Sequence, residues 1–136
     1  NVLTHLVGTA ARLLSETDVE IIELHHAAKR DAPSGTALRL AEAVAAARGV
    51  DLAQAMVSTR SGDTGARPVG AIGVQALRGG DNPGEHTVLF LGRGERLELT
   101  HRAATRDHFA GGALRAARWV VGRPAGLYGM DQVLGL

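Results

Sequence analysis

The sequence predicts an α+β fold, in which a mixed, mostly antiparallel sheet of four to five strands has helices packed on one face. Its 136 residues are enough for one domain, and 45% hydrophobic with 21% charged residues is the composition of a folded globular chain. In the first half, segments with helical spacing of apolar residues alternate with strand-like segments. In the second half, three strand-like segments follow one another closely enough to pair as antiparallel neighbours.

Three segments are predicted to be helical. Apolar residues recur at helical spacing over residues 2–16, where Asn1 can act as the N-cap. The second helix covers residues 35–48, and the third covers residues 108–121 with Asp107 as its cap.

The first strand is predicted over residues 19–25, which are rich in β-branched side chains. The helix over 35–48 can carry the chain from this strand to the next by a right-handed crossover. The remaining strands are predicted over residues 55–60, 70–78, 86–92 and 95–103. We expect the short apolar tail, residues 127–136, to dock against other residues of the chain rather than to extend freely.

These helices can cover only one face of the sheet. We expect the opposite face to be an assembly surface if it carries apolar residues such as Val88, Phe90, Leu97 or Leu99. In the last strand, residues alternate between the two faces, with Leu97, Leu99 and His101 opposite Glu98 and Thr100.

Charge and composition exclude several classes of function. Fifteen basic and fourteen acidic residues leave a net charge of +1, without the basic excess that is typical of nucleic-acid binding. The chain has no cysteine, so it has no disulfide scaffold and no thiol chemistry. No apolar run could span a membrane, and the first residues do not resemble a signal peptide. We therefore expect a cytoplasmic protein that binds neither nucleic acid nor membrane.

Lys29 is the only lysine, whereas the other fourteen basic residues are arginine. An ammonium group can be tuned to release its proton near neutral pH, and a guanidinium cannot. Lys29 is therefore a candidate for proton chemistry, and a surface lysine retained by chance is the plain alternative.

The densest group of reactive side chains begins at the predicted strand end, crosses a loop and enters a helix, which is a common place for ligand sites. Adjacent His25 and His26 would point to opposite faces of a continuing strand, so they make a poor chelating pair. We expect no metal site here. The two histidines can instead serve acid–base chemistry and ligand binding, or can simply be hydrogen-bonded residues at a strand end.

The start of the second helix favours an anion. Its first N–H groups have no partner within the helix and carry the positive end of the helix dipole. Together with the hydroxyls of Ser34 and Thr36, and with Gly35 allowing close approach, they suit a small carboxylate. A plain N-cap, made by Ser34 or Asp31, is the alternative.

One thirteen-residue segment resembles the signature of the 4-hydroxy-tetrahydrodipicolinate reductase (dihydrodipicolinate reductase) family: His25-His26-x-x-Lys29-x-Asp31-Ala32-Pro33-Ser34-Gly35-Thr36-Ala37. Further segments resemble the same family in order along the chain: Glu20-Ile21-Ile22-Glu23, Arg60-Ser61-Gly62, Arg78-Gly79-Gly80-Asp81, Gly84-Glu85-His86-Thr87 and Glu95-Arg96-Leu97-Glu98-Leu99-Thr100-His101.

The resemblance implies an oxidoreductase of lysine and diaminopimelate biosynthesis, which transfers a hydride from NADPH or NADH to 4-hydroxy-tetrahydrodipicolinate and gives tetrahydrodipicolinate. It implies that residues 1–136 form a single C-terminal domain for substrate binding and oligomerisation within a homotetramer. No strand near the start leads through a glycine-rich turn into a helix, so we expect the nucleotide to bind a Rossmann domain absent from this sequence.

The resemblance also assigns roles to residues. His25 and Lys29 would be the acid–base pair, and His26 would contact the dicarboxylate substrate together with Lys29. Arg106 and Phe109 fall where a lip over the site is expected. One carboxylate of the substrate would bind three consecutive residues, Ser34, Gly35 and Thr36.

Two other functions stay open at this point. The chain could be a non-catalytic oligomerisation module, or it could belong to another nicotinamide-dependent dehydrogenase, such as an aspartate or homoserine dehydrogenase. The Lys29 pattern with Ser34-Gly35-Thr36 favours the reductase over other dehydrogenases. Binding of a planar pyridine-2,6-dicarboxylate would separate a substrate domain from an assembly module.

Overall fold

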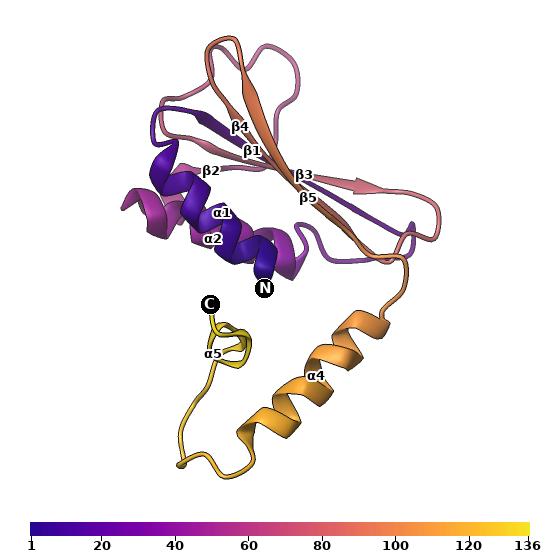
Figure 1. Ribbon diagram of the computed structural model, residues 1–136. Coiled ribbons are helices and arrows are strands. Elements are labelled where there is room, and N and C mark those ends of the chain that lie inside the picture. Colours follow the sequence, from indigo (N-terminus) through magenta and orange to yellow (C-terminus); the bar gives the residue numbers. More distant parts are fainter.

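The structure is a computed structural model that describes residues 1–136, and it is built on one five-stranded sheet (Figure 1). The strands lie in the order β2-β3-β1-β4-β5. Their bounds are β1 Asp18–His25, β2 Met56–Val57, β3 Ile72–Arg78, β4 Glu85–Leu91 and β5 Arg96–Arg102. The helices are α1 Val2–Leu13, α2 Gly35–Arg48, α3 Leu52–Ala55, α4 Asp107–Val120 and α5 Met130–Leu134.

The sheet is mixed, which confirms the predicted α+β class. Strand β1 is parallel to β3 and antiparallel to β4, β2 is parallel to β3, and β5 is antiparallel to β4. Both antiparallel ladders are seven residues long, whereas the parallel ladder between β2 and β3 has only two residue pairs. The crossover through α2 does not place β2 beside β1, because β3 lies between them.

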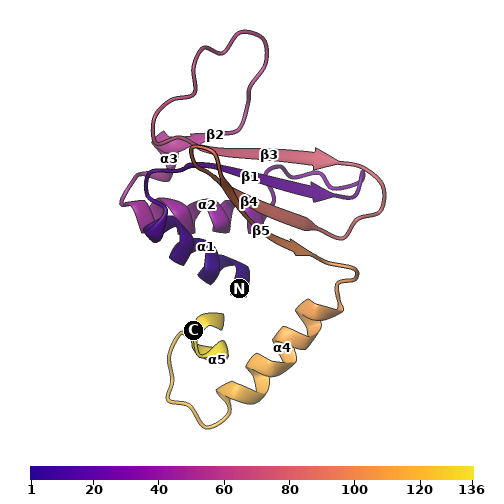
Figure 2. The same ribbon diagram turned by 45° about the horizontal axis from the view of Figure 1, so that its top comes forward.

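Helices α1 and α2 cover one face of the sheet (Figure 2). The strand residues on this face alternate with exposed ones, so β1 contributes Val19 and Ile21 to the core. They pack against Leu40 and Val44 of α2 and against Val7 of α1, all of which are fully buried. This apolar layer fixes the position of α2, and hence of the loop that leads into it.

The residues predicted for the free face of the sheet were the wrong ones. Val88 and Phe90 pair in register with Ile21 and Val19, so they lie on the helix-covered face and are buried. Leu99 and Leu97 pair with Val88 and Phe90 and therefore share that face. The sequence pattern shows which residues alternate, but the face that receives the helices depends on register. The opposite face instead carries other apolar residues, which include Ile22, Leu24, Leu77, Leu89 and Leu91.

Several predicted boundaries shift. The strand expected over 55–60 is reduced to Met56–Val57. The short helix α3 comes directly before it, and Asp51 caps this helix by accepting a hydrogen bond from the N–H of Ala53. Helix α1 ends at Leu13 rather than at residue 16, and Asn1 makes no side-chain cap bond. Asp107 is the first residue of α4, where Arg106 holds the cap position.

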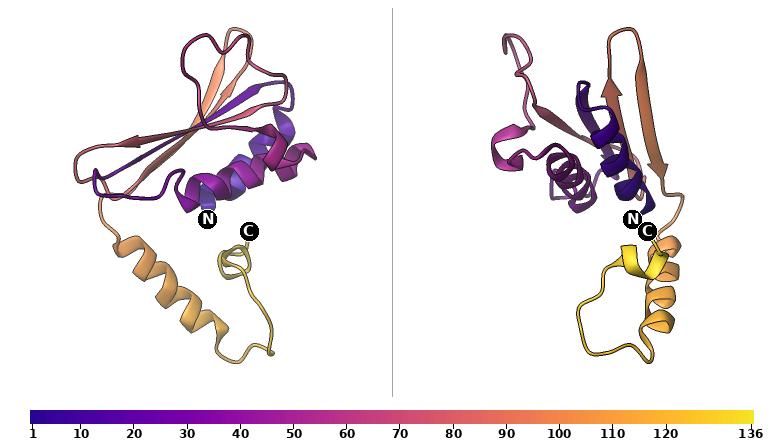
Figure 3. Two further views of the ribbon diagram at one scale, coloured as in Figure 1. Left: turned by 180° about the vertical axis from the view of Figure 1, so that it is seen from behind. Right: turned by 60° about the vertical axis from the view of Figure 1, so that its left-hand side comes forward.

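Helices α4 and α5 lie apart from the sheet and are joined to it through the end of β5 (Figure 3). None of the residues of α4 is buried. The tail docks as predicted through α5, where Val133 is buried, and the rings of Trp119 and Tyr128 meet edge to face with 5.2 Å between their centroids. None of the five helices combines the length and apolar character that a bilayer crossing requires.

Candidate functional site

A cavity of about 720 Å³ opens where the start of α2, the β4–β5 edge of the sheet, α4 and α5 face one another. Four residues named from the sequence line it: His25, Gly35, Thr36 and Phe109. His86 and His101 line it as well, and Phe109 reaches it from α4. The cavity therefore brings a helix N-terminus, several imidazoles and an aromatic ring to one place.

A fully buried carboxylate, that of Glu23, lies behind His25. The Glu23 carboxylate accepts a hydrogen bond of 2.5 Å from Nδ1 of His25 and one of 3.1 Å from the backbone N–H of Ser34. Arg78 completes the group with a bidentate ion pair, in which Nη1 and Nη2 each donate to one carboxylate oxygen at 2.8 Å. Burial would raise the pKa of Glu23, but the hydrogen bonds from Arg78, His25 and Ser34 outweigh it and hold that pKa below its ordinary value.

The contact with Glu23 orients the imidazole of His25. An ionised carboxylate can only accept hydrogen bonds, so Nδ1 of His25 carries a proton. Its Nε2 lies on the side of Gly84, another residue of the cavity wall, where a Cβ atom would come within 2.9 Å of that nitrogen. The neutral His25 side chain can thus accept a proton on Nε2, and the charged one can donate it there.

Ser34 is the N-cap of α2, as one of the two interpretations of this segment predicted. Its Oγ accepts a hydrogen bond of 3.1 Å from the N–H of Ala37 and lies 3.0 Å from Nε2 of His86. Ser34 is only 2% exposed and does not line the cavity, whereas Gly35 and Thr36 do. Burial, assisted by the nearby positive charge of His25, lowers the pKa of His86 to about 4, so His86 is neutral at pH 7.

Lys29 and His26 lie on the loop after β1, outside the lining of the cavity. Nζ of Lys29 donates to both carboxylate oxygens of Asp31 at 2.8 Å, and these bonds lower the pKa of Asp31. Nε2 of His26 lies 3.5 Å from a guanidinium nitrogen of Arg106, which connects the loop to the start of α4. Of the residues named from the sequence, His25, Gly35 and Thr36 thus line the cavity, whereas His26 and Lys29 lie on the loop and Ser34 is buried at the cap of α2.

No group of three or more His, Cys, Asp or Glu side chains is arranged to hold a metal ion. The loop that joins β1 to α2 contains no glycine before Gly35, so it is not the glycine-rich turn of a dinucleotide-binding βαβ unit.

Sequence reasoning assigned no role to three members of this site: Glu23, Arg78 and His86. A signal for two of them was present. Glu23 follows Val19 and Ile21 at the inward positions of β1, and His86 precedes Val88 and Phe90 at the inward positions of β4. A charged or polar residue on a buried strand face needs a partner, and that requirement points to a network. Nothing in the sequence identifies Arg78 as the partner.

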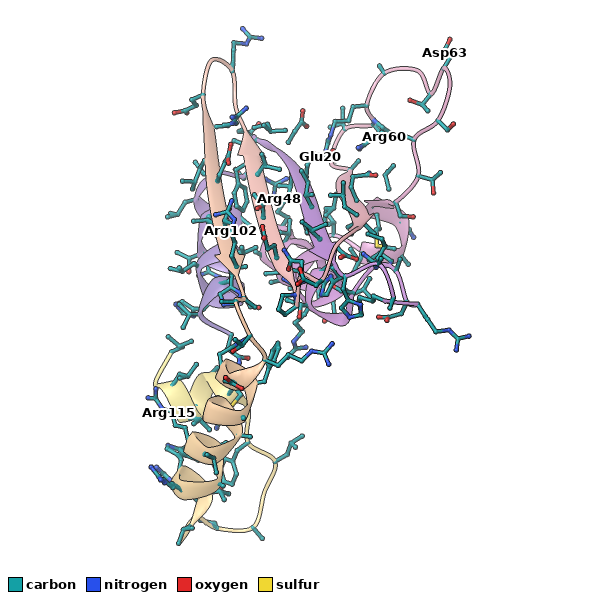
Figure 4. The ribbon with its side chains drawn as sticks, turned by 90° about the vertical axis from the view of Figure 1, so that its right-hand side faces the viewer. Glu20, Arg48, Arg60, Asp63, Arg102 and Arg115 are labelled. Carbon is teal, nitrogen blue, oxygen red and sulfur yellow. The ribbon has the colours of Figure 1, made fainter.

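A second carboxylate–arginine cluster lies at the other end of β1. Arg60 makes a bidentate ion pair with Glu20 at 2.8 Å, and Figure 4 shows the two side chains side by side. Arg67 also binds Glu20, and it reaches Asp18 and the carbonyl oxygens of Val19 and Ala71. These bonds fasten the loop between β2 and β3 to the sheet.

Comparison with known proteins places the chain in a family. The family model described as "Dihydrodipicolinate reductase, C-terminus" matches residues 1–134. The chain belongs to the dihydrodipicolinate reductase family. A 4-hydroxy-tetrahydrodipicolinate reductase of Syntrophobacter fumaroxidans is 59% identical over 137 aligned positions, and one of an Anaeromyxobacter species is 61% identical. Both alignments cover 100% of this chain and 51% of the relative, so the chain spans about half the length of these reductases.

A solved structure leads to the same family. The dipicolinate-bound dihydrodipicolinate reductase from Paenisporosarcina sp. TG-14 is 27% identical, and it superimposes with a TM-score of 0.68 over 96% of this chain and 51% of that one. The fold described above is therefore shared with a dihydrodipicolinate reductase to which dipicolinate is bound. The relationship favours this family over the aspartate and homoserine dehydrogenases considered from the sequence.

Proposed function

We propose that residues 1–136 are the C-terminal substrate-binding and oligomerisation domain of a 4-hydroxy-tetrahydrodipicolinate reductase, acting in lysine and diaminopimelate biosynthesis in the cytoplasm. The observation that carries the proposal is the cavity, which joins the oriented imidazole of His25 to the N-terminus of α2. Membership of the reductase family, and the dipicolinate bound to one structural relative, support a small planar dicarboxylate as substrate.

One carboxylate of the substrate binds at the start of α2. Gly35 and Thr36 line the cavity at this point, and the dipole of the helix that begins there favours a negative charge. The hydroxyl of Ser34 caps the helix and keeps these N–H groups in place. Ser34, Gly35 and Thr36 thus form one anion site, in which Ser34 acts mainly through the backbone.

The proton needed by the reduction comes from His25 and Lys29. Loss of the substrate's 4-hydroxyl as water gives a conjugated ring. Adding a hydride to that ring leaves negative charge, which must be quenched by a proton at the neighbouring carbon. His25 can deliver this proton from Nε2 while Nδ1 stays bound to Glu23. Lys29, four residues further on, is paired with an exposed Asp31, a partner that a bound anion can replace. His26 lies beside Arg106 and is placed to contact the substrate from the loop.

NADPH or NADH supplies the hydride in the reaction proposed for the whole enzyme, which yields tetrahydrodipicolinate, the oxidised nucleotide and water. The residues of this chain offer no dinucleotide fold, so we place the nucleotide on a Rossmann domain outside it.

Calorimetry with pyridine-2,6-dicarboxylate tests the proposed carboxylate site on this chain. Thr36→Val removes a hydroxyl from the anion site, and a hydrogen bond to a charged group contributes on the order of 1.5–3 kcal/mol, so we expect affinity to fall by at least tenfold. Thr59→Val, on the loop between β2 and β3, is the matched control and should bind like the unsubstituted chain. Equal affinity in the two variants would remove Thr36 from the site.

The chain is also proposed to assemble as a homotetramer. Ile22 and Leu77 are 36% and 48% exposed on the sheet face that no helix covers, next to Leu24 and Leu89. Such an apolar patch on a sheet suits self-association with paired contacts. Light scattering should give a mass that is a multiple of the 14.1 kDa of one chain, and Ile22→Lys should lower that mass. An assembled chain that fails to bind dicarboxylate would favour the non-catalytic oligomerisation module.

A further inference from the structure

We infer that Glu23 is the positioning residue of this site: it holds a proton on Nδ1 of His25 and ties that imidazole to the N-terminus of α2. This inference rests on the proposed function, because it gives His25 its working orientation. Glu23 does not line the cavity and acts only through the groups that it binds.

The Glu23 carboxylate accepts hydrogen bonds on both of its oxygens. One oxygen accepts from Nδ1 of His25 and from Arg78, and the other accepts from the N–H of Ser34 and from Arg78. Both oxygens are fully buried, and all four contacts are donors. A carboxylate with these partners remains ionised, and an ionised carboxylate fixes the tautomer of the imidazole beside it.

Glu23 also links the two ends of the loop between β1 and α2. His25 is the last residue of β1, and Ser34 directly precedes α2, so Glu23 binds both ends of this loop. Arg78 strengthens the link, because Nη2 also donates to the carbonyl oxygen of Asp31 at 2.6 Å. The same buried ion pair thus sets the distance between the proton donor and the anion-binding helix start. A negative charge at this place also stabilises the protonated imidazole when it forms.

Glu20 provides a matched control within the same strand. It is also a β1 glutamate in a bidentate ion pair with an arginine, at the same distance of 2.8 Å. It lies on the opposite face of the sheet and contacts no histidine and no residue of α2. A Glu→Gln substitution removes the same charge at both positions, and only the Glu23 substitution changes the environment of His25.

Nitrogen-15 NMR of the histidines in this chain tests the link directly. In the unsubstituted chain, neutral His25 should give the spectrum of a single Nδ1–H tautomer. In Glu23→Gln the amide can donate as well as accept, so both tautomers should be present. Glu20→Gln should leave the His25 signals unchanged. A His25 spectrum that is the same in Glu23→Gln and in the unsubstituted chain would overturn the inference.

Kinetics of the enzyme that carries this domain give the functional readout. We expect Glu23→Gln to lower kcat by about 10²-fold with a smaller change in KM, since the orientation of the acid is lost while the carboxylate site keeps its N–H donors. Glu23→Asp, which keeps the charge, should recover part of kcat.

A double substitution separates positioning from stability. Glu23→Gln leaves the Arg78 guanidinium partly buried without a counter-charge, and the variant can fail to fold for that reason alone. Glu23→Gln with Arg78→Gln restores neutrality, so the fold should recover while kcat and the tautomer of His25 stay altered. Full recovery of kcat in the double variant would contradict the inference and leave Glu23 a structural residue. If the unsubstituted enzyme has no reductase activity, the proposed function is wrong. The tautomer of His25 then still tests whether Glu23 positions that imidazole.

Discussion

Strand β1 carries two carboxylate–arginine clusters that look alike in their pairing and differ in what surrounds them. Glu23 binds Arg78 and Glu20 binds Arg60, each through two bonds of 2.8 Å. In both cases burial would raise the pKa of the glutamate, and the arginine partners outweigh it, so both pKa values lie below the ordinary value. The clusters differ because residues three apart in a strand face opposite sides of the sheet.

The surroundings give the two clusters different roles. The side chain of Glu23 is 0% exposed, on the face covered by α1 and α2, and it also binds His25 and the cap of α2. The side chain of Glu20 is 17% exposed, on the free face, and it binds only arginines from the loop after β2. The same ion pair thus serves a candidate active site at one end and loop attachment at the other. Substitutions at the two ends should therefore have effects of different kinds.

The largest expected effect is at Lys29, on the loop that follows the Glu23 end of β1. Lys29→Arg keeps the positive charge but cannot release a proton at working pH, so turnover should fall by roughly 10²–10⁴-fold while part of the substrate binding remains. Lys29→Ala should lose both. Arg30→Lys, at the exposed neighbouring position, is the control. Steady-state kinetics of the two-domain enzyme measure the difference, and near-native turnover of Lys29→Arg would leave Lys29 with binding alone.

The next largest effect concerns His86, which lies at the same end of β1 as Glu23. Its lowered pKa should make the stability of the chain depend on pH. Burial, with the added positive charge of His25, holds the pKa of His86 near 4 in the folded chain, against 6.5 in the unfolded one. The unfolded chain therefore binds the proton first, and the free energy of unfolding should fall as the pH drops from 6.5 to 4, by on the order of 3 kcal/mol.

Urea unfolding at pH 7 and pH 4.5 measures this loss. His86→Asn should remove most of it, whereas His5→Asn, at an exposed position of α1, should retain it. The lowered pKa values of Glu20 and Glu23 contribute stability that is present above 4.5 and lost below it, so their effect falls in a more acidic range. An unchanged pH dependence in His86→Asn would show that His86 is not the buried titrating group.

Each cluster also has a glycine beside it. Substitution of these two glycines should give a smaller difference in stability. Gly84 has φ +152°, and a Cβ there would lie 2.9 Å from Nε2 of His25, so Gly84→Ala should cost about 1–3 kcal/mol of stability and displace the imidazole. A Cβ at Gly73 would meet the carboxylate of Glu20, which lies at the end of a flexible side chain and can move. Gly73→Ala should therefore cost about 1 kcal/mol or less, the usual contribution of a surface ion pair. Urea unfolding compares the two variants, and dicarboxylate affinity should fall only in Gly84→Ala.

The smallest effect is expected at Arg60. This side chain is 32% exposed, and Arg67 remains to hold the loop when Arg60 is replaced. Arg60→Ala should lower stability by no more than about 1 kcal/mol and increase cleavage of the loop over residues 58–71 by protease, with dicarboxylate binding unchanged. A loss of dicarboxylate binding in Arg60→Ala would mean that the two ends of β1 are coupled.

Much of the secondary structure follows from the sequence alone. The periodic spacing of apolar residues predicts α1, α2 and α4 within a few residues, and the β-branched run predicts β1. A cap at the start of α2 also follows, because a cap bond joins residues only three apart; the sequence left Ser34 and Asp31 as candidates, and the structure selects Ser34. The thirteen-residue segment over His25–Ala37 identified the family for the same reason: it is contiguous.

Tertiary structure decided the rest. Glu23 and Arg78 are 55 residues apart in sequence, and Ser34 and His86 are 52 apart, and nothing local selects these partners. They meet because β1 lies between β3 and β4, which brings the ends of three strands to the start of α2. The same pairing buries Val88 and Phe90 under the helices and leaves Ile22 and Leu77 on the free face. Local periodicity fixes which residues share a face, but only the packing of the sheet against α1 and α2 determines which face is covered.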